Sequence, residues 1–279
     1  MDPASRNPAR PEKDGDAGRT WFVTGASRGL GRAFAEAALR RGDRVVATAR
    51  DLSALSDLDV PDGQLLTLPL DVTDDRSVRT AVAAAVDRFG GLDIVVNNAG
   101  HGTMGAVEEL TESAYRAAMD VNLFGALSVT QAVLPTLRRQ QHGHIIQITS
   151  MGGLVALPMA SAYVASKWAL EAVSESLAQE VAGFGIHVTI IEPTAFATGW
   201  AGATDSAERL PAYDPLREKA AGHAGPPPED PAAAAQALLR VVDAAEPPLR
   251  VIFGTGGVDF IREVYQRRIS DWQNAAPLW

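Results

Sequence analysis

Two side chains capable of acid–base chemistry lie four residues apart in the middle of the chain. Tyr163 and Lys167 stand in a stretch with helical periodicity, so both project from one face of a helix. A nearby ammonium group favours the phenolate and lowers the pKa of a tyrosine, which is normally about 10. Tyr163 could then give or take a proton while a carbonyl or alcohol reacts. Four tyrosines and three lysines placed at random would give this spacing roughly 0.04 times, so a chance match is rare.

A serine at the end of an expected strand would complete such a site. Ser150 follows the strand expected at residues 144–149 and precedes Tyr163 by thirteen residues. Ligands of open α/β sheets collect outside the carboxyl ends of the strands. The Ser150 hydroxyl could therefore bind the oxygen of a substrate and hold it against Tyr163. The alternative is that Ser150 caps a loop.

A glycine-rich turn after the first expected strand, residues 20–24, could hold phosphates. Between this strand and a helix expected at residues 29–41 stands the segment Thr24-Gly25-Ala26-Ser27-Arg28-Gly29-Leu30-Gly31. Gly25 allows a tight turn, while Gly29 and Gly31 allow the backbone to approach a pyrophosphate closely. The exposed N–H groups and the helix dipole would receive the negative charge. A glycine-rich loop alone is weak evidence, but its place between a strand and a helix strengthens it.

The residues at the end of the second expected strand, residues 44–48, indicate whether this turn would bind NAD or NADP. Sites for NAD usually place an acidic residue there, which bonds the ribose 2′-hydroxyl. Here the position is Ala49, with Arg50 after it, and Arg28 stands in the glycine turn. Two guanidinium groups could hold a 2′-phosphate through charge-assisted contacts, the alternative being two solvated surface charges. We therefore expect NADP(H) rather than NAD(H).

The sequence resembles the short-chain dehydrogenase/reductase family from Thr20 to about Gly254. The glycine turn matches the family's TGxxxGxG signature, residues 97–100 match its NNAG motif, and the tyrosine and lysine match its YxxxK pair. The resemblance implies a catalytic tetrad of Asn122, Ser150, Tyr163 and Lys167. In that tetrad the asparagine holds a water molecule that links to the lysine, and the lysine binds the nicotinamide ribose.

The same resemblance implies further contacts with the cofactor. Asp71 would bind the adenine amino group beside the Val72 backbone, although a helix cap is the alternative, which Thr73 or Asp74 could equally supply. Residues 98–100 would line the adenosine ribose, and residues 191–198 correspond to a PG motif that contacts the nicotinamide carboxamide. The expected cofactor contacts are Gly25, Ser27, Arg28, Gly29, Leu30, Gly31, Arg50, Asp71, Val72, Asn98, Ala99, Gly100, Tyr163, Lys167, Pro193, Phe196 and Thr198.

The PG motif departs from the family pattern at one position. Thr194 stands where glycine is usual. Because threonine disfavours a positive φ, we expect this turn to differ locally.

Short runs rich in Val, Ile and Leu alternate with longer helical stretches from Thr20 onward. Continuous rather than alternating apolar runs indicate strands buried on both faces. The pattern predicts an α/β fold: a single-domain, Rossmann-like, doubly wound parallel sheet of about seven strands with helices on both faces. Strands are expected at residues 20–24, 44–48, 65–70, 93–97, 144–149, 187–192 and 249–254. Helices are expected at residues 29–41, 74–89, 111–139, 160–182 and 231–244.

The domain is expected to cover residues 19–279, after a tail at 1–18 that has too little apolar surface to fold. Residues 195–230 interrupt the strand–helix alternation, which indicates either a substrate lid or a poorly ordered loop. His101, directly after the NNAG motif, could contact substrate. An apolar pocket could be lined by Met104, Met151, Leu154, Met159 and Trp200, although methionine equally fills cores.

Composition narrows the classes of function. The chain of 279 residues has no cysteine, which excludes disulfides, thiol nucleophiles and cysteine-ligated metals. The net charge of −9 argues against nucleic acid or an anionic membrane as partner. With no run of about 18 apolar residues and no secretory signal, we expect a cytoplasmic protein. No metal site is expected, because His142 and His144 stand at a strand's start with no acidic partner of suitable spacing.

The leading hypothesis is an NADP(H)-dependent oxidoreductase that interconverts an apolar small-molecule ketone or aldehyde and its alcohol. One alternative is an epimerase or dehydratase that uses transient oxidation on the same scaffold. Another is a non-catalytic redox sensor, which would be expected to lack Tyr163 or Lys167. Enoyl reductases have a longer tyrosine–lysine spacing. The resemblance also implies a homodimer or homotetramer built through the helices at 111–139 and 160–182.

Overall fold

A seven-stranded parallel sheet forms the centre of the computed structural model, which describes residues 18–58, 60–61, 63–198, 205–222 and 227–278. In spatial order the strands are β3 (Leu65–Pro69), β2 (Arg44–Ala49), β1 (Thr20–Val23), β4 (Ile94–Asn97), β6 (Gly143–Ile148), β7 (Ile186–Pro193) and β9 (Arg250–Phe253). Every neighbouring pair is parallel. The predicted fold class is confirmed, and the strand order reverses beside β1, where such sheets bind ligands.

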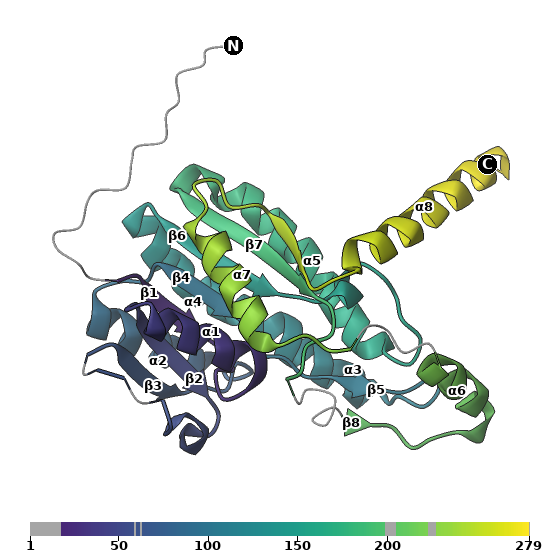
Figure 1. The fold of residues 1–279 in the computed structure, drawn as a ribbon, viewed down its shortest axis with the longest axis horizontal. Coiled ribbons are helices and arrows are strands. Elements are labelled where there is room, and N and C mark those ends of the chain that lie inside the picture. Colours follow the sequence, from purple (N-terminus) through teal and green to yellow (C-terminus); the bar gives the residue numbers. More distant parts are fainter. Residues whose placement is uncertain (1–17, 59, 62, 199–204, 223–226, 279) are drawn as a thin grey trace, which may run out of the picture.

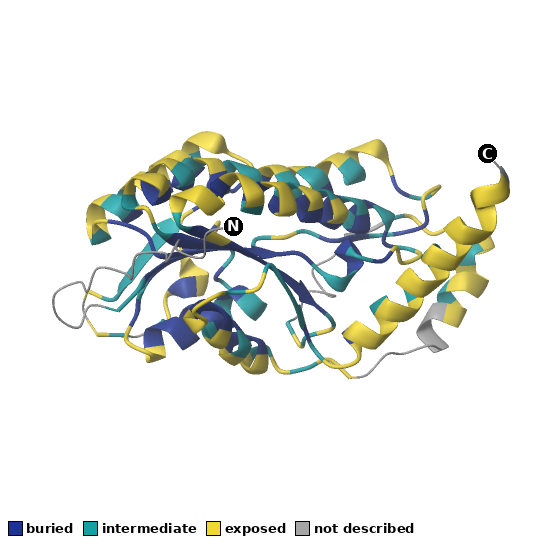
Figure 2. Ribbon diagram, turned by 90° about the horizontal axis from the view of Figure 1, so that it is seen from above, coloured by how far each residue is buried: buried dark blue, intermediate teal, exposed yellow. Residues whose placement is uncertain are grey.

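Helices cover both faces of the sheet (Figure 1). On one face lie α1 (Gly29–Arg40) and α7 (Pro231–Asp243), with Phe34 and Leu238 in the core. On the other lie α2 (Asp75–Phe89), α4 (Ala126–Gln140) and α5 (Ser161–Val181). Figure 2 shows the buried strands between these two helical layers. This burial on both faces explains why the central strands read as continuous apolar runs, such as the fully buried β1.

The helix predicted at residues 111–139 is interrupted. It consists of α3 (Glu112–Met119), a π-helical turn at Asp120–Gly125, and α4. A π-helical turn adds a residue to one helical turn, which hydrophobic periodicity does not reveal. By length and composition alone, the whole stretch Glu112–Gln140 could cross a membrane, but core helices of soluble proteins pass the same test. Here Val129, Val133 and Leu137 are buried against the sheet.

The sequence did not predict a two-stranded sheet and two helices, which lie outside the central sheet and its covering layers. In the expected lid, β8 (Asp205–Ser206) pairs with β5 (Thr103–Met104), and α6 (Asp214–Gly222) follows. After β9 a long helix, α8 (Gly257–Ala275), extends away from the body of the molecule (Figure 1). Within the described residues, the 3-10 turns are Leu52–Leu55, Met151–Gly153, Ala182–Phe184, Pro211–Tyr213 and Ala276–Leu278.

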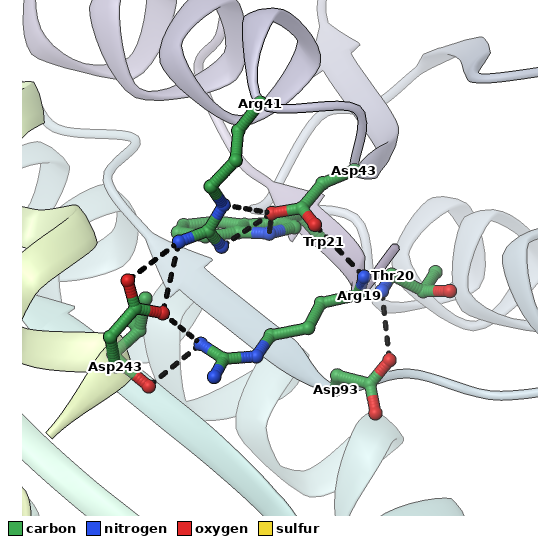
Figure 3. A network of polar contacts seen from close by, with 8 residues as sticks. Arg19, Thr20, Trp21, Arg41, Asp43, Asp93 and Asp243 are labelled. Atoms are coloured by element: carbon green, nitrogen blue, oxygen red, sulfur yellow. Dashed lines mark hydrogen bonds and ion pairs between the residues drawn. The ribbon is translucent and has the colours of Figure 1, made fainter. Parts of the chain in front are cut away.

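A buried carboxylate joins the elements at the amino edge of the sheet (Figure 3). Asp43, which is 4% exposed, accepts hydrogen bonds from the Arg19 backbone at 2.9 Å and from Trp21 Nε1 at 2.8 Å. Arg41 donates its Nε to the same carboxylate at 2.9 Å. The guanidinium groups of Arg19 and Arg41 also reach Asp243 at the end of α7. This network holds the start of β1 to the end of α1, on the edge opposite the predicted ligand site.

Replacing Asp43 by asparagine should destabilise the fold substantially. The substitution leaves an amide group facing buried donors, so we expect the free energy of unfolding to fall by about 3 kcal/mol. Urea denaturation followed by far-UV circular dichroism measures it. As a control, Asp243→Asn changes a half-exposed partner of the same arginines and should cost less than about 1 kcal/mol. Equal losses in the two variants would contradict this account.

Candidate active site

The parallel sheet brings most of the predicted site residues to one edge. The glycine turn follows β1, Arg50 follows β2, and Asp71 follows β3. The NNAG motif spans the end of β4, and Ser150 and Pro193 lie at the ends of β6 and β7. Because all these strands are parallel, their carboxyl ends meet along the same edge of the sheet, as the sequence predicted.

The glycine turn is shaped by close contacts that only glycine permits. Gly25 and Gly29 have φ of +65° and +59°, in the left-handed region. A Cβ atom on Gly31 would collide with the Asn98 side chain and the Gly25 carbonyl. A Cβ atom on Gly29 would lie 2.9 Å from Cβ of Thr198, so Thr198 stands directly over the turn.

The start of α1 suits an anionic ligand. Its N-cap residue, Arg28, makes no side-chain cap hydrogen bond, so the backbone N–H groups of the first helical turn are not capped by that side chain. These donors, the helix dipole and the close approach allowed by the glycines together fit the diphosphate of a dinucleotide. The predicted residues Ser27 and Leu30 are half-buried beside the turn.

Thr24 and Asn98 clamp the turn to the end of β4. The Thr24 hydroxyl oxygen accepts hydrogen bonds from the backbone N–H groups of Asn98 and Ala99, at 2.9 and 3.0 Å. In return, Asn98 Nδ2 donates to the carbonyls of Thr24 and Gly25, at 3.0 and 3.1 Å. The Asn98 amide nitrogen therefore shapes the turn itself. The role of Thr24 was missed, because one threonine in a strand gives no signal of its partners.

The two arginines predicted to select the cofactor are both exposed at this edge. Arg50 lies close enough to Asp71 for its charge to contribute to a lowered pKa of that carboxyl. The larger cause is hydrogen bonding to Thr73, whose hydroxyl and N–H both donate to Asp71 Oδ1, at 2.7 and 3.0 Å. Asp74, not Asp71, is the N-cap of α2. Val72 is buried beside them.

Ser150 and Tyr163 lie together at the end of β6. A Cβ atom on Gly152 would lie 3.4 Å from Ser150 Oγ and 3.6 Å from Tyr163 Cε1, so the two side chains border the same point. The Ser150 hydroxyl is close enough to lower the pKa of the phenol, and its Oγ also accepts the Gly152 N–H at 3.0 Å. Ser150 thus caps the 3-10 turn at Met151–Gly153, as the alternative predicted, and it also lies beside the tyrosine. Its binding of a substrate oxygen stays a prediction.

The low pKa expected for Tyr163 is not found in the protein without a bound cofactor. Burial raises the pKa of the phenol, and the hydrogen bond to Ser150 offsets this only in part. Lys167 is on the same face of α5, with Nζ 5.8 Å from the centre of the tyrosine ring. However, Nζ donates to the Ile148 carbonyl at 2.8 Å. The prediction from spacing alone omitted desolvation, which favours the neutral phenol.

Lys167 is itself buried, at 4% exposed. Burial lowers the pKa of its ammonium group to about 8, against the opposing charge of Glu171. At neutral pH the lysine is therefore still mostly protonated, and it titrates just above the physiological range.

Asn122 lies in the π-helical turn, where it is almost fully buried. Its Oδ1 accepts the His101 N–H at 2.7 Å, and its Nδ2 donates to the His101 carbonyl and to Ser166 Oγ, both at 2.8 Å. A Cβ atom on Gly100 would lie 3.4 Å from Asn122 Oδ1 and 3.8 Å from Lys167 Nζ. Both polar groups are therefore close to the backbone of Gly100. The predicted tetrad is therefore brought together.

The segment after β7 continues the site toward the glycine turn. Pro193 is buried, Phe196 packs against the core, and Thr198 reaches Gly29 as described above. Thr194 has no positive φ, and its N–H bonds the Phe253 carbonyl at 2.8 Å. Its side chain occupies the space beside Gly254, where a Cβ atom would collide with it. The local difference expected at Thr194 thus involves packing against β9.

The expected substrate side is described in part. His101 is half-buried, and its Nε2 lies 3.2 Å from the Thr103 hydroxyl. Met151 is half-buried directly after Ser150, whereas Trp200 lies outside the described residues. Met159, in a left-handed conformation with φ of +65°, accepts the Gly105 N–H through its carbonyl at 2.8 Å. A non-glycine residue in this conformation is strained, which is typical of functional segments.

The described part of the expected lid is anchored beside His101. Glu109, whose side chain is fully buried, accepts the Leu210 N–H at 2.7 Å and forms an ion pair with Arg217. Its other oxygen accepts the Ala106 N–H at 2.7 Å. These bonds lower the pKa of Glu109 to about 2, with the Arg217 hydrogen bond as the largest cause. Residues 205–222 are thus held to the segment that follows the NNAG motif.

The two histidines weighed for a metal lie at the opposite edge of the sheet. His142 does have an acidic partner, Asp93, at 3.1 Å, which sequence spacing did not reveal. His144 is buried, bonds Thr189 at 2.8 Å, and has its pKa lowered by burial to about 3. Across the residues that the structure describes, no three His, Asp or Glu side chains are placed to hold a metal ion.

Known proteins are similar to this chain in sequence and in fold. The family model of short chain dehydrogenase matches residues 19–209. Oxidoreductase BOA17 of Botryotinia fuckeliana is 41% identical over 249 residues, which cover 87% of this chain and 91% of that protein.

Two solved structures extend the comparison. A short-chain dehydrogenase from Streptomyces avermitilis, 40% identical, superposes with a TM-score of 0.86 and covers 95% of this chain and 98% of its own. A short chain dehydrogenase from Burkholderia cenocepacia in complex with NADP is 28% identical, with a TM-score of 0.74 and coverage of 92% and 97%. With the glycine turn, the NNAG motif and the tyrosine–lysine pair assembled at one sheet edge, the chain belongs to the short-chain dehydrogenase family of oxidoreductases.

Proposed function

We propose that this protein is an NADP(H)-dependent carbonyl reductase that interconverts a ketone or aldehyde and the corresponding alcohol. The observation that carries the proposal is the adjacent pair of Ser150 and Tyr163, which border the same point beside Gly152, with the buried Lys167 next to them and the glycine turn along the same edge. Two hydroxyl donors that meet at one point can polarise a single carbonyl oxygen.

The chain's own groups supply the proton. When bound, the reduced nicotinamide supplies a hydride to the carbonyl carbon. Ser150 then holds the substrate oxygen, on which negative charge develops, and Tyr163 donates its proton to that oxygen. Because burial raises the pKa of Tyr163, the phenol keeps its proton at neutral pH and is ready to act as an acid. The protonated Lys167 favours the phenolate that remains.

The choice of NADP(H) rests on charge at the end of β2. Ala49 is buried there and carries no group that would bond a ribose hydroxyl or repel a phosphate. Arg50 and Arg28 are exposed and project from two segments that border the same edge. The NADP complex of the Burkholderia cenocepacia relative is consistent with this choice. Half-buried Met151 and Leu154, at the two ends of the 3-10 turn that Ser150 caps, support an apolar substrate.

Removing Arg50 should weaken binding of NADPH selectively. In Arg50→Ala we expect the affinity for NADPH to fall at least about tenfold, which is about 1.4 kcal/mol, and the affinity for NADH to change little. Titration followed by cofactor fluorescence measures both. Arg76→Ala, an exposed arginine in the first turn of α2, is the matched control and should leave both affinities unchanged. Equal or tighter binding of NADH by the wild type would overturn the NADP assignment.

Removing the Tyr163 hydroxyl should abolish turnover without loss of cofactor binding. For Tyr163→Phe we expect kcat/KM for ketone reduction to fall by about 10²–10⁴-fold, because proton donation is lost. The rate of NADPH consumption with each of a panel of apolar ketones measures kcat/KM. The control is Tyr115→Phe, which removes a hydroxyl 2.7 Å from Ser161 at the start of the same helix. If both variants lose activity equally, Tyr163 is not the acid.

A further inference from the structure

A cluster of charged side chains lies behind the catalytic lysine, and the mechanism above does not use it. We call Glu171, Glu175, Glu192 and Arg250 the Arg250 cluster. Arg250 on β9 forms ion pairs with Glu171, with Glu175 at 2.8 Å and with Glu192 at 3.2 Å. Glu171 and Glu192 are only 5% and 2% exposed. Burying two carboxylates around one guanidinium group has a high desolvation cost. We therefore ask what function the Arg250 cluster has beside Lys167.

Glu171 is the member of the cluster that adjoins the site. It lies one helical turn after Lys167 on the same face of α5. Its Oε2 is held by Arg250, while its Oε1 is buried and has no hydrogen-bond partner among the described residues. A Cβ atom on Gly153 would lie 3.2 Å from this Oε1. The free oxygen therefore borders the 3-10 turn that Ser150 caps.

The charge of Glu171 acts on Lys167. Desolvation favours the neutral amine, and the carboxylate of Glu171 opposes it. Tyr163 is the other titratable group beside the lysine, and its ring lies 5.8 Å from Nζ. Among the residues that the structure describes, the charged groups joined to Glu171 through Arg250 are Glu175 on its own helix and Glu192 on β7.

We propose that Glu171, held by Arg250, is a positioning residue whose carboxylate keeps the buried Lys167 protonated and directed at the Ile148 carbonyl. The meaning of this role for catalysis rests on the proposed reductase function. Arg250 fixes the direction of the carboxylate, and through it the last strand of the sheet is coupled to the catalytic helix.

The protonation of Glu192 reduces the negative charge that Arg250 has to balance. Burial, together with the charge of Glu171, raises the pKa of Glu192 to about 7, in spite of Arg250. Near neutral pH Glu192 therefore carries a proton part of the time, which leaves the guanidinium group to the carboxylate of Glu171. Glu192 directly precedes Pro193, so the cluster also borders the segment expected to contact the nicotinamide.

The direction of the effect on Lys167 follows from the sign of the charges. With Glu171 present, the ammonium form persists to higher pH. Without that carboxylate, the pKa of Lys167 falls further below its ordinary value, so the lysine loses its proton at a lower pH. Reduction needs the protonated lysine beside Tyr163, so the alkaline limb of its pH profile should move in the same direction.

The test is a titration of Lys167 itself. The sequence has only three lysines, so protein labelled with ¹³C at lysine Cε gives three NMR signals, and Lys13 and Lys219 serve as internal references. We expect Glu171→Gln to lower the titration midpoint of Lys167 by about one pH unit. Glu175→Gln is the matched control, because it removes a half-exposed carboxylate from the same arginine and should leave the midpoint unchanged.

A second variant and a second readout separate positioning from folding. Glu171→Asp keeps the carboxylate but draws it back by one methylene group, so its midpoint should fall by less than that of Glu171→Gln and its pH profile of kcat/KM should recover toward wild type. An unchanged midpoint in both variants overturns the proposal, as does a shift of equal size in Glu175→Gln. Wild-type protein that reduces no ketone would refute the proposed function, while the NMR titration would still decide the role of Glu171.

Discussion

The active-site edge depends on one steric constraint, the missing side chain of Gly31. Any Cβ atom there would collide with the Asn98 amide and the Gly25 carbonyl, so only glycine lets the first turn of α1 lie against the end of β4. This contact allows Asn98 and Thr24 to exchange hydrogen bonds across the turn. It places the N–H groups at the start of α1 and the NNAG motif side by side, and Gly100 then borders both Asn122 and Lys167. The catalytic groups are thus located relative to the cofactor turn by backbone packing.

Desolvation is the second constraint, and it acts differently at the two edges of the sheet. At the amino edge, Asp43 is buried but accepts hydrogen bonds from several donors, so its charge is compensated and serves the fold. At the carboxyl edge, desolvation raises the pKa of Tyr163 and lowers that of the buried Lys167, and the opposing effects of Ser150 and Glu171 compensate these shifts only in part. Incomplete compensation is typical of functional sites, because a group that titrates near neutral pH can exchange protons with a substrate.

The sequence was sufficient for the fold and for the location of the site, and insufficient for its electrostatics. Apolar runs and turn glycines predicted all seven sheet strands to within one or two residues, and parallel strands bring their carboxyl ends together whatever the loops do. The π-helical turn at Asn122 was missed because apolar periodicity continues through it. The raised pKa of Tyr163 and the ion pairs of Arg250 were missed because burial and partners far apart in sequence are tertiary properties.

The protonation form that Tyr163 presents follows from the same electrostatics. A tyrosine whose pKa is raised holds its proton at neutral pH, which suits donation to a carbonyl oxygen better than abstraction from an alcohol. Oxidation would first require a phenolate, and the cation that would favour it is a lysine with its own pKa lowered to about 8. Raising the pH to deprotonate Tyr163 would therefore discharge Lys167 first and remove the charge that stabilises the phenolate. For the proposed reductase, Tyr163 is therefore present at neutral pH in the acid form that reduction of a carbonyl group needs.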